Sequence, residues 1–157
     1  MSAVPTFSAT VSRIQIIDAA RGWLGTPYVH QASAHGAGCD CLGLVRGVWC
    51  ELYGGEPEAP PAYTPDWNER RWKSDGGADT LLDAARRNMA ERADKSFEPG
   101  DVLIFRICAD GPAKHCGIAV APDRFVHAYA GRAVIESWLS RWWRERLAGA
   151  FVFPGAE

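Results

Sequence analysis

The chain has 157 residues, of which 47% are hydrophobic and 23% charged, and its net charge is −2. This length suits one domain with its own hydrophobic core, so we expect a single domain over residues 1–157 with a core at about 12–153. The balanced charge excludes the strongly basic surface that nucleic-acid-binding proteins show, and we expect no nucleic-acid partner.

The N-terminal residues 1–7 have neither the basic region nor the apolar stretch of a secretion signal. The longest apolar runs also fall far short of the roughly 18 residues that a membrane-spanning helix needs. We therefore expect synthesis in the cytoplasm without a signal peptide, and no membrane association. A reducing cytosol disfavours disulfides, and the chain has five cysteines, an odd number, so at least one thiol should be free to react.

The first half of the chain carries helical patterns. Ser12 and Gln15 have the spacing of a capping box, which predicts the first helix. Residues 28–39, rich in Gly and Ala, are predicted to form a loop. Asp40 is a suitable N-cap for a second helix, whose apolar positions recur at helical spacing until Gly54.

The second half changes from helix to strand. Residues 56–68 carry four prolines and are predicted to be an irregular surface segment. The remaining expected elements are a helix over 78–91, strands over 101–105, 115–121, 125–129, 134–136 and 150–153, and a short helix over 138–146. Helices first and consecutive antiparallel strands afterwards imply an α+β fold, with N-terminal helices packed on a C-terminal antiparallel sheet.

Cys41 is the candidate nucleophile, because it directly follows the N-cap Asp40. A cysteine attacks as the thiolate, and its ordinary pKa leaves little thiolate at neutral pH. The free N–H groups and the dipole of a helix N-terminus favour a negative charge there. The same N–H groups are able to bind the oxyanion of a tetrahedral intermediate.

Two histidines supply the other groups that such a thiol needs. An imidazole must take the thiol proton and later give it to the leaving amine, and we assign this role to His115. A third group must hold that imidazole in one tautomer, and we assign this role to His127. Both lie on predicted neighbouring antiparallel strands, which can bring two inward side chains within hydrogen-bond distance.

Five short motifs follow one another over residues 14–153: Gly25-Thr26-Pro27-Tyr28, Asp40-Cys41-x-Gly43-Leu44, Pro99-Gly100-Asp101-Val102-Leu103-Ile104-Phe105, His115-x-Gly117-Ile118 and His127-Ala128. In this order they resemble the NlpC-type family of cell-wall cysteine peptidases. The resemblance implies a compact papain-like fold reduced to its catalytic core, and hydrolysis of peptide-stem bonds of peptidoglycan, commonly the γ-D-glutamyl–diaminopimelate bond.

The resemblance also implies residue roles. It makes Cys41 the nucleophile, His115 the base and His127 the third polar residue. It places Tyr28 beside the nucleophile, so we expect Tyr28 and Asp40 at the oxyanion and substrate site, with no metal and no cofactor. The family usually has a serine where this chain has Leu42, so the resemblance does not fix which peptide bond is cleaved.

The expected absence of an export signal requires another route to the cell wall. The segments Cys39–Gly43 and Tyr53–Pro57 are most similar to family members encoded with phage and gene-transfer-particle tails. We therefore expect incorporation into a virion-like tail, with tail or baseplate proteins as partners, and action in the periplasm or cell wall. The alternatives are a structural tail component with the same fold, and an amidase or acyltransferase that uses the same nucleophile.

The cysteines and histidines near the motifs allow alternative roles. Cys39 is the rival nucleophile, but it precedes the helix. His30, His35, Cys39 and Cys41 together are an alternative zinc cluster, which would consume Cys41 as a ligand. The remaining cysteines are interpreted as packing residues: Cys50, Cys108 and Cys116.

The segment 138–146 alternates tryptophan with arginine. An amphipathic helix with one solvated arginine face is favoured over a docking surface, although tryptophan and arginine are both common at interfaces.

Overall fold

The computed structural model describes residues 10–60 and 79–157. Its helices are α1 (Arg13–Gly22), α2 (Cys41–Tyr53), α4 (Thr80–Asn88) and α5 (Arg141–Glu145), with one 3₁₀ helix, η1 (Ala93–Lys95). Its strands are β1 (Ser33–Ala34), β2 (Gly38–Cys39), β3 (Ala90–Glu91), β4 (Val102–Phe105), β5 (His115–Ala121), β6 (Arg124–Ala128), β7 (Val134–Trp138) and β8 (Leu147–Val152).

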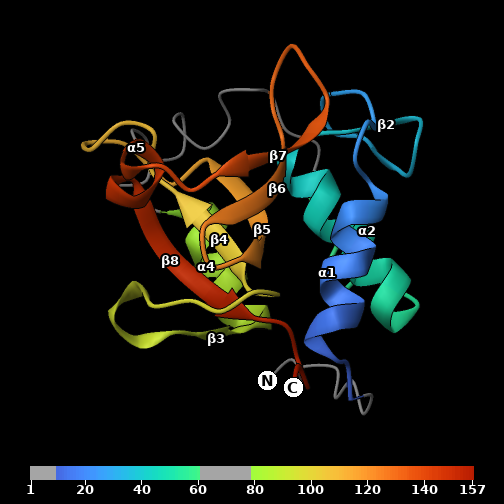
Figure 1. The fold of residues 1–157 in the computed structure, drawn as a ribbon, viewed down its shortest axis with the longest axis horizontal. Helices are drawn as coiled ribbons and strands as arrows, with labels where there is room; N and C mark the ends of the chain where they lie inside the picture. Colours follow the sequence, from blue (N-terminus) through green and yellow to red (C-terminus); the bar gives the residue numbers. More distant parts are fainter. Residues whose placement is uncertain (1–9, 61–78) are drawn as a thin grey trace.

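Six strands form one antiparallel sheet in the order β3-β8-β4-β5-β6-β7. Helices α1 and α2 lie side by side along one side of it (Figure 1), and α2 packs mainly on β5. The short pair β1–β2 forms a separate two-stranded sheet near the start of α2. The predicted α+β arrangement of helices on an antiparallel sheet is confirmed.

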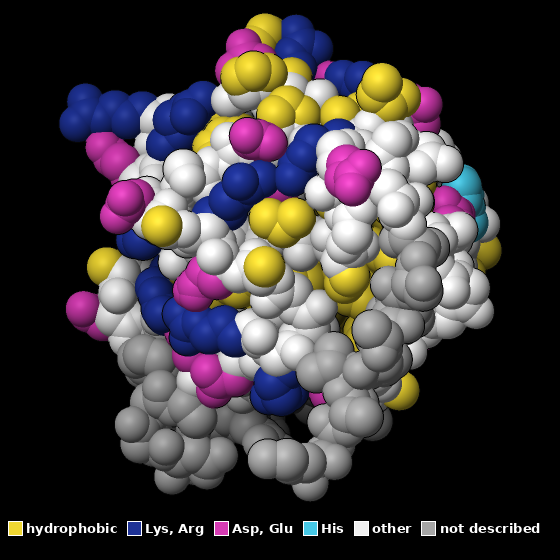
Figure 2. All heavy atoms as spheres, turned by 90° about the horizontal axis from the view of Figure 1, so that it is seen from below, with side chains coloured by type: hydrophobic (Ala, Val, Ile, Leu, Met, Phe, Trp, Pro, Cys, Tyr) yellow, Lys and Arg dark blue, Asp and Glu magenta, His cyan; other side chains and the backbone are white. Residues whose placement is uncertain are grey.

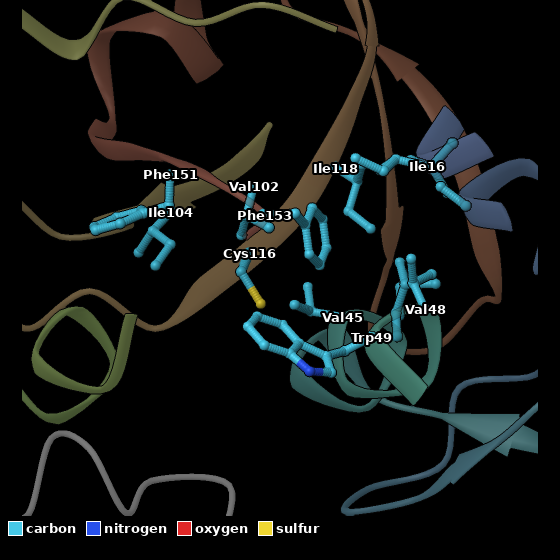
Figure 3. Packing of buried hydrophobic residues seen from close by; sticks show 14 of the residues in the cluster. Ile16, Val45, Val48, Trp49, Val102, Ile104, Cys116, Ile118, Phe151 and Phe153 are labelled. Carbon is cyan, nitrogen blue, oxygen red and sulfur yellow. The ribbon is translucent and has the colours of Figure 1, made fainter. Parts of the chain in front are cut away.

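The core divides according to the two faces of the sheet, because side chains alternate along each strand. On the helical face, Cys116 and Ile118 of β5 point toward Val45 and Trp49 of α2 (Figure 3). The opposite face carries a smaller cluster that includes Phe105. Burying each large apolar side chain stabilises the fold by about 1.5–3 kcal/mol, so this packing fixes the middle of α2 against β5.

The helix starts predicted at Ser12 and at Asp40 are confirmed. The Ser12 hydroxyl accepts the Gln15 N–H at 3.1 Å, and the Gln15 side chain accepts the Ser12 N–H at 2.9 Å, which completes the capping box. Asp40 caps α2, and the helix ends at Gly54 in the left-handed conformation, with φ of 81°. These are local signals, in which a short side chain satisfies helix N–H groups that have no partner inside the helix.

The motif around Asp101 connects α1 to the sheet. The Asp101 carboxylate is fully buried and accepts hydrogen bonds from the Arg13 and Arg92 guanidinium groups, each at 2.9 Å. It also accepts the Glu98 N–H at 2.9 Å. A buried charge is tolerated only when it is paired in this way, so Asp101 holds the N-terminus of α1 against the start of β4.

Several predicted boundaries are wrong, and the strand expected over 150–153 begins earlier, at Leu147. The helix expected over 78–91 ends at Asn88, because residues 90–91 pair with β8 as strand β3. Trp138 belongs to strand β7 and not to a helix, since it pairs with Arg124, whose guanidinium lies 3.9 Å from the centre of the Trp138 ring. The loop expected over 28–39 contains the β1–β2 pair.

Some predictions fall on other parts of the chain. Residues 1–9 and 61–78 lie outside the described residues, so the expectations for the N-terminus, for most of segment 56–68 and for the first residues of the third helix are not addressed.

On the face seen in Figure 2, basic and acidic side chains interleave and form no patch of one sign. Within the described ranges no helix has the length and hydrophobicity to cross a bilayer.

Candidate active site

The start of α2 is held by the buried Asp40, which is 3% exposed. One carboxylate oxygen accepts the Gly43 N–H at 2.7 Å, and the other accepts the Gln31 N–H at 2.9 Å. Asp40 therefore fixes both the first turn of the helix and the preceding loop. Because both oxygens are already acceptors, the contribution of Asp40 that the geometry displays is positioning, and its expected contact with substrate stays a prediction.

Gly43 is required by the same loop. A Cβ atom at this position would lie 1.9 Å from the Ala32 carbonyl oxygen, so the loop backbone passes directly over the helix start. The Ser33 hydroxyl donates to the Gly43 carbonyl at 2.7 Å and fastens the loop there. The Asp-Cys-x-Gly spacing thus places Cys41 at a helix N-terminus that the loop partly covers.

Cys41 is half-buried, and its thiol lies 3.9 Å from the Lys114 carbonyl oxygen. The pKa of this thiol is held well below its ordinary range. A hydrogen bond from the Cys116 thiol is the largest cause; burial opposes it, and a hydrogen bond to His115 and the His115 charge lower the pKa further. The thiolate is the nucleophilic form, so a lowered pKa favours attack by Cys41.

His115 and His127 lie on neighbouring strands β5 and β6. The Nε2 atom of His115 is 2.8 Å from Nδ1 of His127, and Nε2 of His127 is 2.8 Å from the Ser137 hydroxyl on β7. The remaining ring nitrogen of His115 is Nδ1, which is free to exchange a proton with Cys41. The side chains Cys41, His115, His127 and Ser137 thus form one connected series.

The protonation state of His127 follows from its burial. It is 1% exposed, and burial, followed by the charge of His115, lowers its pKa to about 3. His127 therefore carries a single N–H. When His115 is the imidazolium, both of its nitrogens donate, so Nδ1 of His127 must accept and Nε2–H must donate to Ser137. Ser137 selects the tautomer in which His127 stabilises a protonated His115.

Aromatic rings enclose this pair of histidines. Phe125 stacks on His127 at 4.1 Å between ring centroids, and Trp143 lies 5.3 Å from His115 and 5.2 Å from His127. Phe105 is also near His115, at 6.1 Å. Such walls exclude water and strengthen the hydrogen bonds between the rings. The two tryptophans of α5 lie on different sides of this helix. Trp143 faces the histidines, while Trp142 is exposed.

Tyr28 lies beside the thiol, half-buried against the core. Its backbone forms a bridge with Cys39, and its N–H donates to the Arg132 carbonyl at 3.4 Å. Burial, followed by the charges of Cys41 and Asp40, raises the pKa of Tyr28 to about 12. The hydroxyl consequently stays protonated and can donate a hydrogen bond, which is what its expected oxyanion role requires.

The other cysteines differ from Cys41. Cys39 is fully buried, and burial, followed by the charge of Asp40, raises its pKa to about 12, which disfavours its thiolate. Burial also raises the pKa of Cys50. Cys108 is exposed, contrary to its interpretation as a packing residue. Cys116 is buried as expected, but it also contacts the Cys41 thiol, which a pure packing role does not include.

The two loop histidines have structural contacts. His35 stacks on Trp23 at 4.7 Å and bonds to Glu51 at 2.6 Å and to the Gly22 carbonyl at 2.7 Å, so it fastens the loop to α1 and α2. His30 lies 3.9 Å from the Asp40 carboxylate. In residues 10–60 and 79–157 no group of three His, Cys, Asp or Glu side chains is arranged to hold a metal ion.

The sequence reasoning missed Ser137 and the Cys41–Cys116 contact. Alternation along the strands could have found Ser137, because His127 pairs with Ile135 and residue 137 lies on the same face one diagonal step away. The Cys116 contact gave no local signal, since it depends on how closely the start of α2 approaches the start of β5.

The chain is similar to known proteins in sequence and in fold. The family model described as the NlpC/P60 family matches residues 25–152. A gamma-DL-glutamyl hydrolase of Bacillus subtilis (strain 168) is 27% identical over 138 residues, which is 87% of this chain but 28% of that protein's length.

Solved structures share the fold. The NlpC/p60 domain of the peptidoglycan hydrolase SagA is 21% identical, with a TM-score of 0.61 over 91% of this chain and 100% of that chain. An NlpC/P60 family protein from Bacillus cereus is 20% identical, with a TM-score of 0.60 over 90% of this chain and 40% of that chain. These likenesses confirm the compact fold that the sequence predicted.

Proposed function

Because this chain belongs to the NlpC/P60 family, we propose that it is a cysteine peptidase that hydrolyses peptide-stem bonds of peptidoglycan. The thiol hydrolase class predicted from the sequence is confirmed at the level of the family. The observation that carries the proposal is the position of Cys41. Its thiol has a lowered pKa at the start of α2, next to a histidine that a second, neutral histidine orients.

The geometry supports acyl transfer in two steps. The Cys41 thiolate attacks the scissile carbonyl carbon, and the oxyanion accepts hydrogen bonds from N–H groups at the start of α2 and from the Tyr28 hydroxyl. Collapse of this intermediate breaks the C–N bond, and Nδ1–H of His115 protonates the leaving amine. His115 then takes a proton from water, which attacks the thioester, and collapse releases the acid and restores the thiolate.

The γ-D-glutamyl bond is the proposed point of cleavage. The support is the related Bacillus subtilis protein, whose name describes a gamma-DL-glutamyl hydrolase. Incubation of the protein with purified muropeptides, followed by mass spectrometry, tests this directly, with Cys41→Ala as the control. Products cut only at another bond would contradict the γ-D-glutamyl assignment. Cleavage of simple amides or thioesters without cleavage of muropeptides would favour an amidase or acyltransferase.

Delivery by a phage-like tail is proposed as the route to the cell wall. The support is the likeness of segments Cys39–Gly43 and Tyr53–Pro57 to tail-associated family members. Particles purified from producing cells by density gradient should contain the protein in the same fractions as tail proteins, detected by antibody. Detection only in fractions free of particles would contradict this route. Particles that carry the protein and keep full wall-degrading activity after Cys41→Ala would favour the structural alternative.

A further inference from the structure

A cavity of about 350 Å³ lies next to the buried histidine pair, between the β6–β7 hairpin and α5. His127 and Ser137 form part of its wall, and Tyr129 and Arg132 reach it from the hairpin. This volume is at the lower end of the range for small-molecule sites. The walls combine aromatic rings, the hydroxyl-bearing Tyr129 and Ser137, and one cation, so the cavity suits a small group that is apolar on one side and negatively charged on the other.

Arg132 differs from the other arginines of residues 10–60 and 79–157. Each of the others bonds to a carboxylate or to a carbonyl oxygen. Within these residues the Arg132 guanidinium makes neither an ion pair nor a hydrogen bond. A guanidinium presents five N–H donors in a planar fork that matches a carboxylate, so this exposed side chain is available to a carboxylate from a ligand.

The β6–β7 hairpin ties the backbone of Arg132 to that of Tyr28, a residue of the candidate active site. Gly131, with φ of 78°, allows the hairpin to turn, and the Arg132 N–H donates to the Tyr129 carbonyl at 3.0 Å. The Arg132 carbonyl accepts the N–H of Tyr28, the residue beside Cys41. The hairpin therefore fixes the base of this side chain at the edge of the candidate active site, and only the side chain itself has to adjust to a bound anion.

Two tryptophans form the opposite side of the cavity. The rings of Trp142 and Trp143 meet edge to face at 4.8 Å, and the Arg146 guanidinium lies 3.8 Å from the centre of the Trp142 ring. These contacts hold Trp142 in place although it is 45% exposed. A pre-positioned exposed indole offers apolar surface to a ligand at a low cost in conformational entropy.

We propose that Arg132 binds the free α-carboxylate of the γ-linked glutamyl residue, while Trp142 contacts the methylene groups of that residue. The inference rests on the proposed function, since hydrolysis at a γ-glutamyl bond leaves the α-carboxylate a few bonds from the carbonyl that Cys41 attacks. The enzyme should consequently distinguish stem peptides by the state of this group, and it should prefer the free acid to the α-carboxamide.

The test compares two synthetic γ-D-glutamyl peptides that differ only in this group, the α-carboxylate and the α-carboxamide. Arg132→Gln should lower kcat/KM for the carboxylate peptide by about 10- to 100-fold and change kcat/KM for the carboxamide peptide less than about twofold. Arg132→Lys should recover part of the loss, because a point charge remains without the fork. Arg86→Gln, on helix α4, is the matched control and should leave the discrimination unchanged. An equal loss on both peptides, or no loss on either, would overturn the proposal.

Direct binding separates this inference from the proposed function. Calorimetry with Cys41→Ala should show tighter binding of the carboxylate peptide than of the carboxamide peptide, and the Arg132→Gln substitution in the same background should abolish the difference. If the wild-type protein cleaves neither peptide but this difference in binding is found, the peptidase assignment fails and the anion site stands. If both peptides bind equally, the anion site fails whatever the protein cleaves.

Discussion

Nε2 of His115 lies 2.8 Å from Nδ1 of His127, and this one contact separates the roles of the two rings. It leaves Nδ1 of His115 for proton exchange with Cys41 and places His127 one ring further from the thiol. His127 acts only through His115, as an acceptor that stabilises the imidazolium. The two histidines are therefore unequal, although each lies on its own strand of the same sheet.

Substitutions of the two histidines should have different effects. His115→Ala removes the proton-transfer group and should abolish nearly all activity. His127→Asn keeps an acceptor at the same position, so a measurable fraction of activity should remain. Single-turnover acylation rates at several pH values measure both effects, with near-UV circular dichroism as the folding control. An active His115→Ala together with an inactive His127→Asn would require the two roles to be exchanged.

The buried neutral His127 should also make stability depend on pH. Its pKa is about 3 in the folded protein, against an ordinary value of 6.5, so between these values the unfolded chain binds the extra proton. The free energy of unfolding should therefore fall as the pH is lowered from about 6.5 toward 3. Urea unfolding at several pH values should show a shallower dependence for His127→Asn than for the wild type. Identical dependence in the two proteins would contradict the burial of a neutral imidazole.

Ser137 should act as a positioning residue. Ser137→Ala removes the acceptor for His127 Nε2–H, so the ring loses the preference for the tautomer that supports a protonated His115. A hydrogen bond of this kind contributes about 0.5–1.5 kcal/mol, so kcat should fall about 2- to 10-fold while KM stays near its wild-type value. Ser137→Thr keeps the hydroxyl and should restore most of kcat. A change confined to thermal stability, with kcat unaffected, would remove Ser137 from the catalytic series.

Cys116 should influence the reactivity of Cys41 without reacting itself. Removal of its thiol in Cys116→Ala takes away the largest cause of the lowered Cys41 pKa. The pH at which iodoacetamide half-maximally alkylates Cys41 should therefore rise, and Cys50→Ala is the matched control that should not move it. Peptide mapping after a short exposure measures this, with the exposed Cys108 as the reference site. An unchanged midpoint in Cys116→Ala would contradict the hydrogen bond.

Local signals in the sequence predicted most of the fold. The Ser12 capping box and the Asp40 N-cap depend on residues three positions apart, so they can be found without knowledge of the fold. Strand β5 was predicted at its observed boundaries because its apolar run is long. The strand over residues 90–91 was missed because two residues carry no periodicity, and only pairing with β8 makes them extended.

Features of the candidate site that depend on neighbouring residues in the sequence could be predicted. Features that depend on how helices pack against the sheet could not. The preference for Cys41 over Cys39 followed from the helix start alone. The contact of Cys116 with Cys41 and the enclosure by Trp143 arise from packing of α2 and α5 against the sheet, which no local pattern encodes. Ser137 is intermediate, because strand alternation places it correctly only after the β6–β7 register is known.

The most direct test of the account is the covalent intermediate at Cys41. The protein is mixed with a γ-D-glutamyl peptide, quenched in acid within milliseconds to seconds, digested and mapped by mass spectrometry. The account predicts a thioester of the glutamyl fragment on Cys41 and no adduct in Cys41→Ala, which should remain folded and cleave nothing. An adduct on Cys39, or full cleavage by Cys41→Ala, would contradict it.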